Sequence, residues 1–157
     1  MVEIFGPSLD ALMLSSGGKL ELRFAIELAK QMIERIELVH SRGYVHRDLR
    51  PEHFLYGREN RPKRLFLSGF AITKKYLRSD GKHQGYRDNR LSFAGTARYC
   101  SINTQLGVEQ SRRDDMEAIF YILIYIIRGY LPWQGVKALD RKDKFEKIMV
   151  AKVTTHI

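Results

Sequence analysis

The sequence predicts a single, mainly α-helical domain with small β-hairpins, and three observations support this. Its 157 residues suffice for one domain with a packed core, but not for two of ordinary size. Hydrophobic residues make up 44% of the chain, which favours a folded globule over a disordered segment. Long segments of helical apolar periodicity alternate with short β-forming runs that turn residues bound. We therefore expect helices to build the core and the strands to be short.

The first expected elements are a short helix and a long one. Gly6-Pro7 forms a break, after which Ser8 or Asp10 can cap a short helix through Met13. Apolar residues then recur every three or four positions from about 20 to 41, which predicts a long amphipathic helix. Its predicted core-facing stripe comprises Leu22, Ala25, Ile26, Ala29, Ile33, Ile36 and Val39.

A charged loop pinned by a proline follows, with the sequence His46-Arg47-Asp48-Leu49-Arg50-Pro51-Glu52-His53. It lies between the β-forming runs 44–45 and 54–56, so the pattern predicts strand, loop and strand. A loop held at both ends presents Asp48 at a fixed angle, as a general base needs. Residues 65–67 are predicted to pair with residues 54–56 as a hairpin.

The second half of the chain is predicted to contain one long loop and two helices. Polar and basic residues from 73 to 93 show no sustained period, which predicts a long surface loop. Residues 116–128 are apolar on nearly every side, so we expect this helix at the centre of the domain. Asp114 and Asp115 can cap its first turn. Residues 140–151 give a final amphipathic helix.

Composition limits the classes of partner and compartment. With 27 Lys+Arg against 18 Asp+Glu, the net charge of +9 favours anionic partners such as phosphorylated or acidic proteins, nucleic acid or anionic lipid. The single cysteine, Cys100, allows no internal disulfide and suits a cytoplasmic or nuclear location. No signal-peptide pattern is present. The longest apolar run, 118–127, is about half of the ~20 residues that a membrane span needs, so no span is expected.

Several motifs resemble those of one protein family. His46-Arg47-Asp48-Leu49 matches the start of the protein-kinase catalytic loop. Further blocks are similar to the casein kinase I family of protein serine/threonine kinases: Gly6-Pro7-Ser8-Leu9, Gly95-Thr96-Ala97-Arg98-Tyr99, Ser101-Ile102-Asn103, residues 109–117 and Leu131-Pro132-Trp133-Gln134-Gly135. The similarity extends from about residue 2 to residue 150. It implies a protein-kinase-like C-terminal lobe.

The resemblance also indicates what the chain lacks. Residues 2–9 match the hinge between the two kinase lobes, so the N-terminal lobe is expected to be absent, with its Gly-rich loop and its phosphate-binding lysine. Residues 1–157 are accordingly predicted to form a partial kinase domain. Phe120 stands where kinases usually have glycine. In a packed interior it would strain the fold by about 1–3 kcal/mol unless the local packing differs.

Two positions that would hold magnesium in the family are replaced. The family uses an asparagine that ends the catalytic loop and the aspartate of an Asp-Phe-Gly motif. Here His53 and Gly69 stand at these positions, and neither supplies the oxygen ligand that magnesium prefers. Asp48 keeps the base position but is predicted to be idle, and Arg50 replaces the usual loop lysine. No cofactor or metal is expected, and ATP and magnesium would be required only by an active kinase.

The resemblance also assigns sites that could bind anions, because converging arginines and lysines hold phosphate oxygens well. A substrate-anion site is assigned to Arg98, Gly129 and Lys137. A second anion cluster is assigned to Arg47, Lys74 and Arg90. Weak nucleotide binding at the hinge would involve Glu3, Phe5 and Leu55. The alternative is that these cations are ordinary solvated side chains.

The sequence therefore predicts a casein kinase I-like pseudokinase or kinase fragment that binds phosphorylated or acidic protein partners without phosphotransfer. One alternative is an ATP-dependent serine/threonine kinase whose N-terminal lobe is missing from the sequence, and another is a non-functional gene remnant. Specific nucleic-acid binding is disfavoured, because the aromatic residues are dispersed through core segments. Self-association through the exposed surface that would face the missing lobe is a further expectation.

Overall fold

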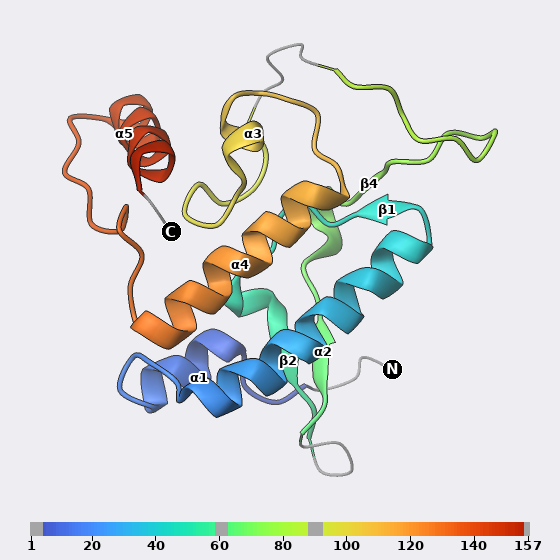
Figure 1. Cartoon of the computed structure of the whole chain (residues 1–157). Helices are drawn as coiled ribbons and strands as arrows, with labels where there is room; N and C mark the ends of the chain where they lie inside the picture. Colours follow the sequence, from blue (N-terminus) through green and yellow to red (C-terminus); the bar gives the residue numbers. More distant parts are fainter. Residues whose placement is uncertain (1–4, 59–62, 88–92, 156–157) are drawn as a thin grey trace.

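The computed structural model describes residues 5–58, 63–87 and 93–155, and in this part of the chain helices predominate (Figure 1). The helices are α1 (Leu9–Ser15), α2 (Leu22–Ser41), α3 (Ile102–Gln105), α4 (Arg112–Arg128) and α5 (Arg141–Thr154), with 3-10 turns η1 (Pro51–His53) and η2 (Phe70–Ile72). The strands are β1 (Tyr44–Val45), β2 (Phe54–Tyr56), β3 (Leu65–Leu67) and β4 (Lys74–Lys75). The predicted class, helices with small antiparallel sheets, is confirmed. None of the described helices combines the length and the apolarity that crossing a membrane requires.

The short helix α1 starts where the sequence predicts. The hydroxyl of Ser8 accepts a hydrogen bond from the backbone N–H of Ala11 at 3.2 Å and thereby caps the first turn. Leu9 and Met13 lie four positions apart and are both fully buried. This spacing directs α1 onto the core with a single face.

The long helix α2 matches its predicted extent, but the predicted core-facing stripe is wrong in part. The buried residues are Ala25, Leu28, Met32 and Ile36. Leu22, Ile26 and Ile33 remain 61%, 59% and 42% exposed. The segment carries two overlapping apolar stripes, and the β2–β3 hairpin and α4 cover only one of them. Which stripe is covered depends on distant segments, so local periodicity could not decide it.

Helix α4 begins four residues before its predicted start. A capping box closes its first turn: the side chain of Asp114 accepts from the backbone N–H of Ser111 at 2.7 Å. Helix α4 packs against α2 and contributes to the core, in line with the expected central position, but one of its sides is open to solvent, because the side chain of Phe120 is 61% exposed. Phe120 therefore does not strain a packed interior. Of the two outcomes that the sequence left open, a difference in local packing is the one observed.

Two small antiparallel sheets flank the charged loop. Strands β2 and β3 form the predicted hairpin, in which Leu55 pairs with Phe66. Strand β1 pairs instead with β4, through Tyr44 with Lys75 and Val45 with Lys74. The prediction of an irregular loop from 73 to 93 is thus wrong at its start, because a two-residue strand gives no periodic signal.

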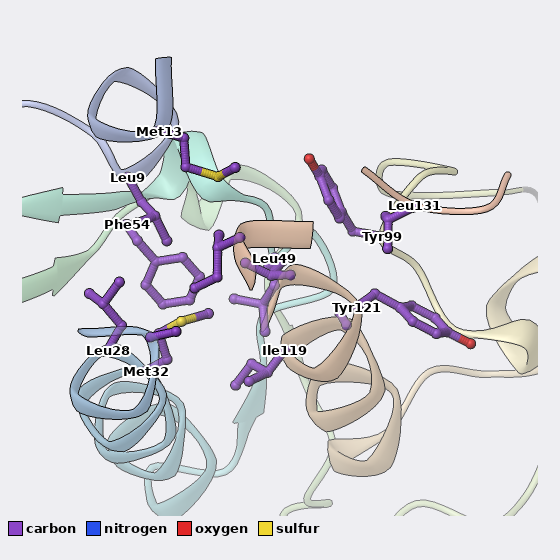
Figure 2. Close-up of a cluster of buried hydrophobic side chains, with 14 of the residues drawn as sticks. Leu9, Met13, Leu28, Met32, Leu49, Phe54, Tyr99, Ile119, Tyr121 and Leu131 are labelled. Carbon is purple, nitrogen blue, oxygen red and sulfur yellow. The ribbon is translucent and has the colours of Figure 1, made fainter. Parts of the chain in front are cut away.

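The hydrophobic core fixes the position of β2, the strand that follows the charged loop. Phe54 of β2 is fully buried, and Figure 2 shows it between Leu9 of α1 and the α2 side chains Leu28 and Met32. Ile119 and Tyr121 of α4 extend the same cluster. Because Phe54 directly follows His53, this anchorage fixes the end of the charged loop.

Helix α5 is held by a buried lysine. Lys152 donates hydrogen bonds to the backbone carbonyls of Ala97 at 2.9 Å and Cys100 at 2.6 Å. Its ammonium also lies over the rings of Tyr121 and Trp133, at 5.0 and 5.4 Å from the ring centroids. Burial lowers the pKa of Lys152, and the carbonyls and aromatic faces offset the cost of enclosing the charge. This contact fixes α5 against the segment 97–100.

Candidate functional site

The carboxylate of Asp115, in the first turn of α4, holds the loop 46–53 through hydrogen bonds to its backbone. Its two oxygens accept the backbone N–H groups of His46 at 2.8 Å and Arg47 at 2.9 Å. The Nε2 atom of His40 lies 2.8 Å from the same carboxylate. Asp115 is therefore more than the helix cap that the sequence predicted. A buried carboxylate with three donors fixes the loop backbone, including Arg47, whose φ of 75° is the one positive value outside glycine in the described chain.

His46 is a fully buried histidine. Its Nε2 atom lies 2.8 Å from the carbonyl of Ser68, so Nε2 carries the proton and donates it. Nδ1 is then free to accept the backbone N–H of Asp48 at 3.3 Å. Burial lowers the pKa of His46, which keeps the ring neutral. His46 thus ties the loop 46–53 to the segment that precedes η2.

Asp48 faces a hydroxyl group from a distant segment. One carboxylate oxygen accepts a hydrogen bond from the hydroxyl of Thr96 at 2.7 Å. The neighbouring Gly95 permits this approach: its φ is 116°, and a Cβ atom there would lie 2.7 Å from the carbonyl oxygen of Arg47. Asp48 therefore serves as an anchor for the segment 93–98.

His53 and Gly69, the two positions at which the resemblance places magnesium ligands, lie in direct contact. His53 directs Nδ1 at the carbonyl oxygen of Asp48, 2.7 Å away. A Cβ atom on Gly69 would lie only 2.4–2.5 Å from atoms of the His53 ring. The imidazole therefore fills the space that a side chain at position 69 would occupy, and Gly69, with a φ of 82°, is the residue that fits.

Backbone contacts reinforce this junction. Ser68 donates both its N–H, at 2.9 Å, and its hydroxyl, at 3.1 Å, to the carbonyl of His53. These hydrogen bonds join the two segments that a metal ion would bridge in a kinase. In the described ranges, no group of three or more His, Cys, Asp or Glu side chains is placed to hold a metal ion. The absence of a bound metal or cofactor remains a prediction.

Arg50, the replacement for the loop lysine, lies at the edge of this region. Its Nε atom is 3.9 Å from a carboxylate oxygen of Glu52, and both side chains are more than one-third exposed. An ion pair this long and this exposed contributes little to stability. Arg50 is therefore available to anionic groups that approach the loop.

A groove of about 510 Å³ opens beside Thr96. Its walls are the segment 93–99, the turn 133–135 and the face of α5. Three exposed cations line it, Arg98 and the two α5 residues Arg141 and Lys144. Glu52 is the acidic residue among the lining side chains. The groove thus carries an excess of positive charge, which favours anionic ligands.

The floor of the groove is apolar and rigid. Tyr99 and Trp133 are buried, and the indole N–H of Trp133 donates to the carbonyl of Arg98 at 2.8 Å. The rings of Phe93 and Phe145 meet at 4.8 Å in an edge-to-face arrangement across the two walls. These contacts hold Arg98 and α5 in a fixed relation.

Only one of the three residues assigned to the substrate-anion site lines this groove. That residue is Arg98. Gly129 ends α4 with a φ of 83° and packs against the carbonyl of Gly18. Lys137 is exposed, and its carbonyl accepts a hydrogen bond from Lys147.

Arg141 and Lys144 were missed by the sequence reasoning. Both lie in the first turn of α5, three positions apart and hence on one face. The combination of two cations and Phe145 on the start of an amphipathic helix was the available signal. Its orientation toward Arg98 depends on the buried Lys152 contact, which no local pattern contains.

The second predicted anion cluster is only partly described. The ammonium of Lys74 forms an ion pair with the carboxylate of Glu109, at 2.9 and 3.1 Å from its two oxygens. Its charge is thereby neutralised locally. Arg47 lies in the loop that Asp115 holds. Arg90 lies outside the described residues.

Two of the three predicted nucleotide-binding residues, Phe5 and Leu55, lie at the β2–β3 hairpin. The ring of Phe5 lies 5.1 Å from that of Phe66, and Leu55 is the strand partner of Phe66. Leu55 also forms a β-bridge with Ser8. Glu3 lies outside the described residues. In a comparison with protein-family models, no family matches this chain.

Proposed function

We propose that this chain is a casein kinase I-like C-terminal lobe that binds phosphorylated or acidic protein segments and does not transfer phosphate. The observation that carries the proposal is the groove with Arg98, Arg141 and Lys144, which opens next to the Asp48–Thr96 contact. Guanidinium groups bind phosphate oxygens in pairs, and a lysine adds a mobile point charge. An extended segment with a phosphate or several carboxylates matches this lining.

The loop region supports the absence of phosphotransfer. Kinase catalysis depends on metal ions that oxygen ligands hold against the phosphates of ATP. Here the imidazole of His53 lies against Gly69, where a ligand side chain would have to stand. Asp48, the residue at the base position, is engaged by the hydroxyl of Thr96. The same residues that resemble a catalytic loop thus act as a support for the groove wall.

Titration of a fluorescent phosphopeptide and its unphosphorylated twin tests the binding proposal. We expect the wild type to prefer the phosphopeptide. Arg98→Ala should weaken its binding by about tenfold, which corresponds to the loss of one charge-assisted contact. Lys142→Ala is the matched control, because Lys142 is an exposed α5 cation that does not line the groove. Equal losses in both variants, or equal affinity for both peptides, would reduce the binding to non-specific charge.

A thermal melt with ATP, with and without magnesium, tests the alternative of an active kinase. A ligand that binds only the folded state raises the unfolding midpoint. We expect a cooperative transition, and we expect its midpoint to stay the same when ATP and magnesium are added together. A magnesium-dependent increase would favour the kinase alternative. The lack of any cooperative transition would favour the gene remnant.

A further inference from the structure

An apolar surface on the outer side of α2 and α4 has no partner in the described chain. It consists of Leu22, Ile26 and Ile33 on α2 with Phe120 and Ile127 on α4, and we name it the α2–α4 face. All five side chains are at least 37% exposed. Solitary exposed apolar residues are ordinary, but a contiguous set on two adjacent helices marks an interaction surface.

The contacts between α2 and α4 show that these residues belong to one surface. Ile26, Ile33 and His40 follow one another at intervals of seven residues, so all three lie on one side of α2. His40 contacts Asp115 of α4, which means that this side borders α4. On α4, Tyr121 faces Trp133 and the Lys152 of α5. Phe120 and Ile127, seven residues apart, lie away from that side, and Figure 1 shows α2 and α5 on opposite sides of α4.

Two opposite charges flank Ile33. Lys30 precedes it by three positions and Glu37 follows it by four, so the three side chains lie on one side of the helix. Both charged residues are exposed, and neither forms an ion pair with any residue in the described ranges. Along this side of α2, the basic Lys30, the apolar Ile33 and the acidic Glu37 therefore follow one another.

We propose that the α2–α4 face mediates a two-fold symmetric homodimer in which α2 packs antiparallel to α2 of a second copy. A two-fold axis beside Ile33 places this residue against the partner's Ile33. The same operation brings Lys30 to the partner's Glu37, and symmetry generates the pair twice. The two α2 and two α4 helices then enclose their exposed apolar residues as in an antiparallel four-helix arrangement.

This interface differs from the one that the sequence alone suggested. Self-association was expected through the surface that would face a missing N-terminal lobe, whereas the charge pattern that suits a second copy lies on α2. The proposal does not depend on the groove or on peptide binding. A second copy is favoured over another partner because Lys30, Ile33 and Glu37 are complementary to the same three residues of a second copy.

Sedimentation equilibrium of the wild-type chain and of charge-reversal variants tests the dimer. We expect a dimer in the micromolar range. Lys30→Glu and Glu37→Lys should each weaken it by about tenfold or more, because each turns two attractive pairs into two repulsive ones. The double variant Lys30→Glu/Glu37→Lys should restore the wild-type association, since the pairs re-form with exchanged signs. Ile33→Glu should abolish it.

Glu27→Lys is the matched control for the charge change. Glu27 is exposed on the side of α2 that lines a separate pocket with Phe24 and Lys63, away from Ile33. It should leave the dimer unchanged, and circular dichroism should show folded protein in every variant. A wild type that stays monomeric at hundreds of micromolar, or a double variant that fails to re-associate, would overturn the proposal.

Discussion

The two regions on either side of the Asp48–Thr96 contact differ in packing: one is filled by protein atoms and the other is an open groove. On one side, the imidazole of His53 and the backbone of Ser68 and Gly69 fill the junction between two loops. On the other side, an open groove of about 510 Å³ carries three exposed cations. The filled region contributes rigidity, because His53, Ser68 and Gly69 contact one another there. The open groove has the volume and the positive charge to bind an anionic ligand. The position of its walls depends on the rigidity of the filled region.

This difference makes the effects of mutation separable. Changes in the filled region should lower the free energy of unfolding, since its groups are buried and bonded to one another. Changes in the open groove should lower peptide affinity and leave stability alone, since its cations are exposed. Proteins in which chemistry and folding share the same residues do not allow this separation.

The largest effect is expected from Asp115→Ala. Removal of the carboxylate leaves the backbone N–H groups of His46 and Arg47 without acceptors and His40 without its partner. Breaking such a buried network should lower the free energy of unfolding by about 3–5 kcal/mol, measured by urea titration. Asp80→Ala, which removes an exposed carboxylate, should change it by less than about 0.5 kcal/mol. Similar values for the two variants would contradict the role given to Asp115.

A somewhat smaller loss is expected from Gly69→Asp, because its Cβ atom would overlap the His53 ring. The overlap and the positive φ together should cost about 3 kcal/mol. His53→Ala/Gly69→Asp should recover more than half of that loss, because the obstructing ring is gone. Urea titration of both variants and of His53→Ala completes the cycle. Additive losses in the double variant would show that the two positions do not interact.

In the groove, Arg141→Ala/Lys144→Ala should lower the affinity for an acidic or phosphorylated peptide by about tenfold, or ~1.4 kcal/mol. The free energy of unfolding should change by less than about 0.5 kcal/mol, because both side chains are exposed. Fluorescence anisotropy and urea titration measure the two quantities on the same samples. Lys137→Ala provides the comparison, since Lys137 does not line the groove. A larger loss from Lys137→Ala would favour the site that the family resemblance assigns.

The smallest effect concerns pH and His46. Burial lowers the pKa of His46 in the folded state, so the unfolded chain takes up the proton first as pH falls. The contribution to stability is present above the unfolded pKa of about 6.5 and is lost as pH falls toward the folded pKa. The slope cannot exceed about 1.4 kcal/mol per pH unit for one group. His46→Gln should show a shallower decline between pH 7 and 5.5 than the wild type, and equal slopes would exclude His46 as the cause.

Local signals in the sequence predicted the parts of the fold that local interactions determine. The Ser8 cap, the extent of α2 and the β2–β3 hairpin each follow from residues close in sequence. Distant contacts decided the rest. The pairing of β1 with β4 joins segments about thirty residues apart.

The same limit applied to the candidate site. His53 and Gly69 were identified as unusual by comparison with a family pattern, but their mutual contact arises only from the fold. Arg141 and Lys144 became part of the groove because Lys152, on the same helix, is buried against the carbonyls of Ala97 and Cys100. Exposure of Phe120 likewise reflects which helices are packed against α4, and composition does not encode this.

The contact between His53 and Gly69 also constrains which pairs of residues these two positions can hold. With this backbone, no side chain can be present at position 69 while the imidazole of His53 is in place. The two positions are therefore coupled, and the residue at one determines which residues the other can accept. A variant that gains an acidic residue at position 69 would have to replace His53 as well.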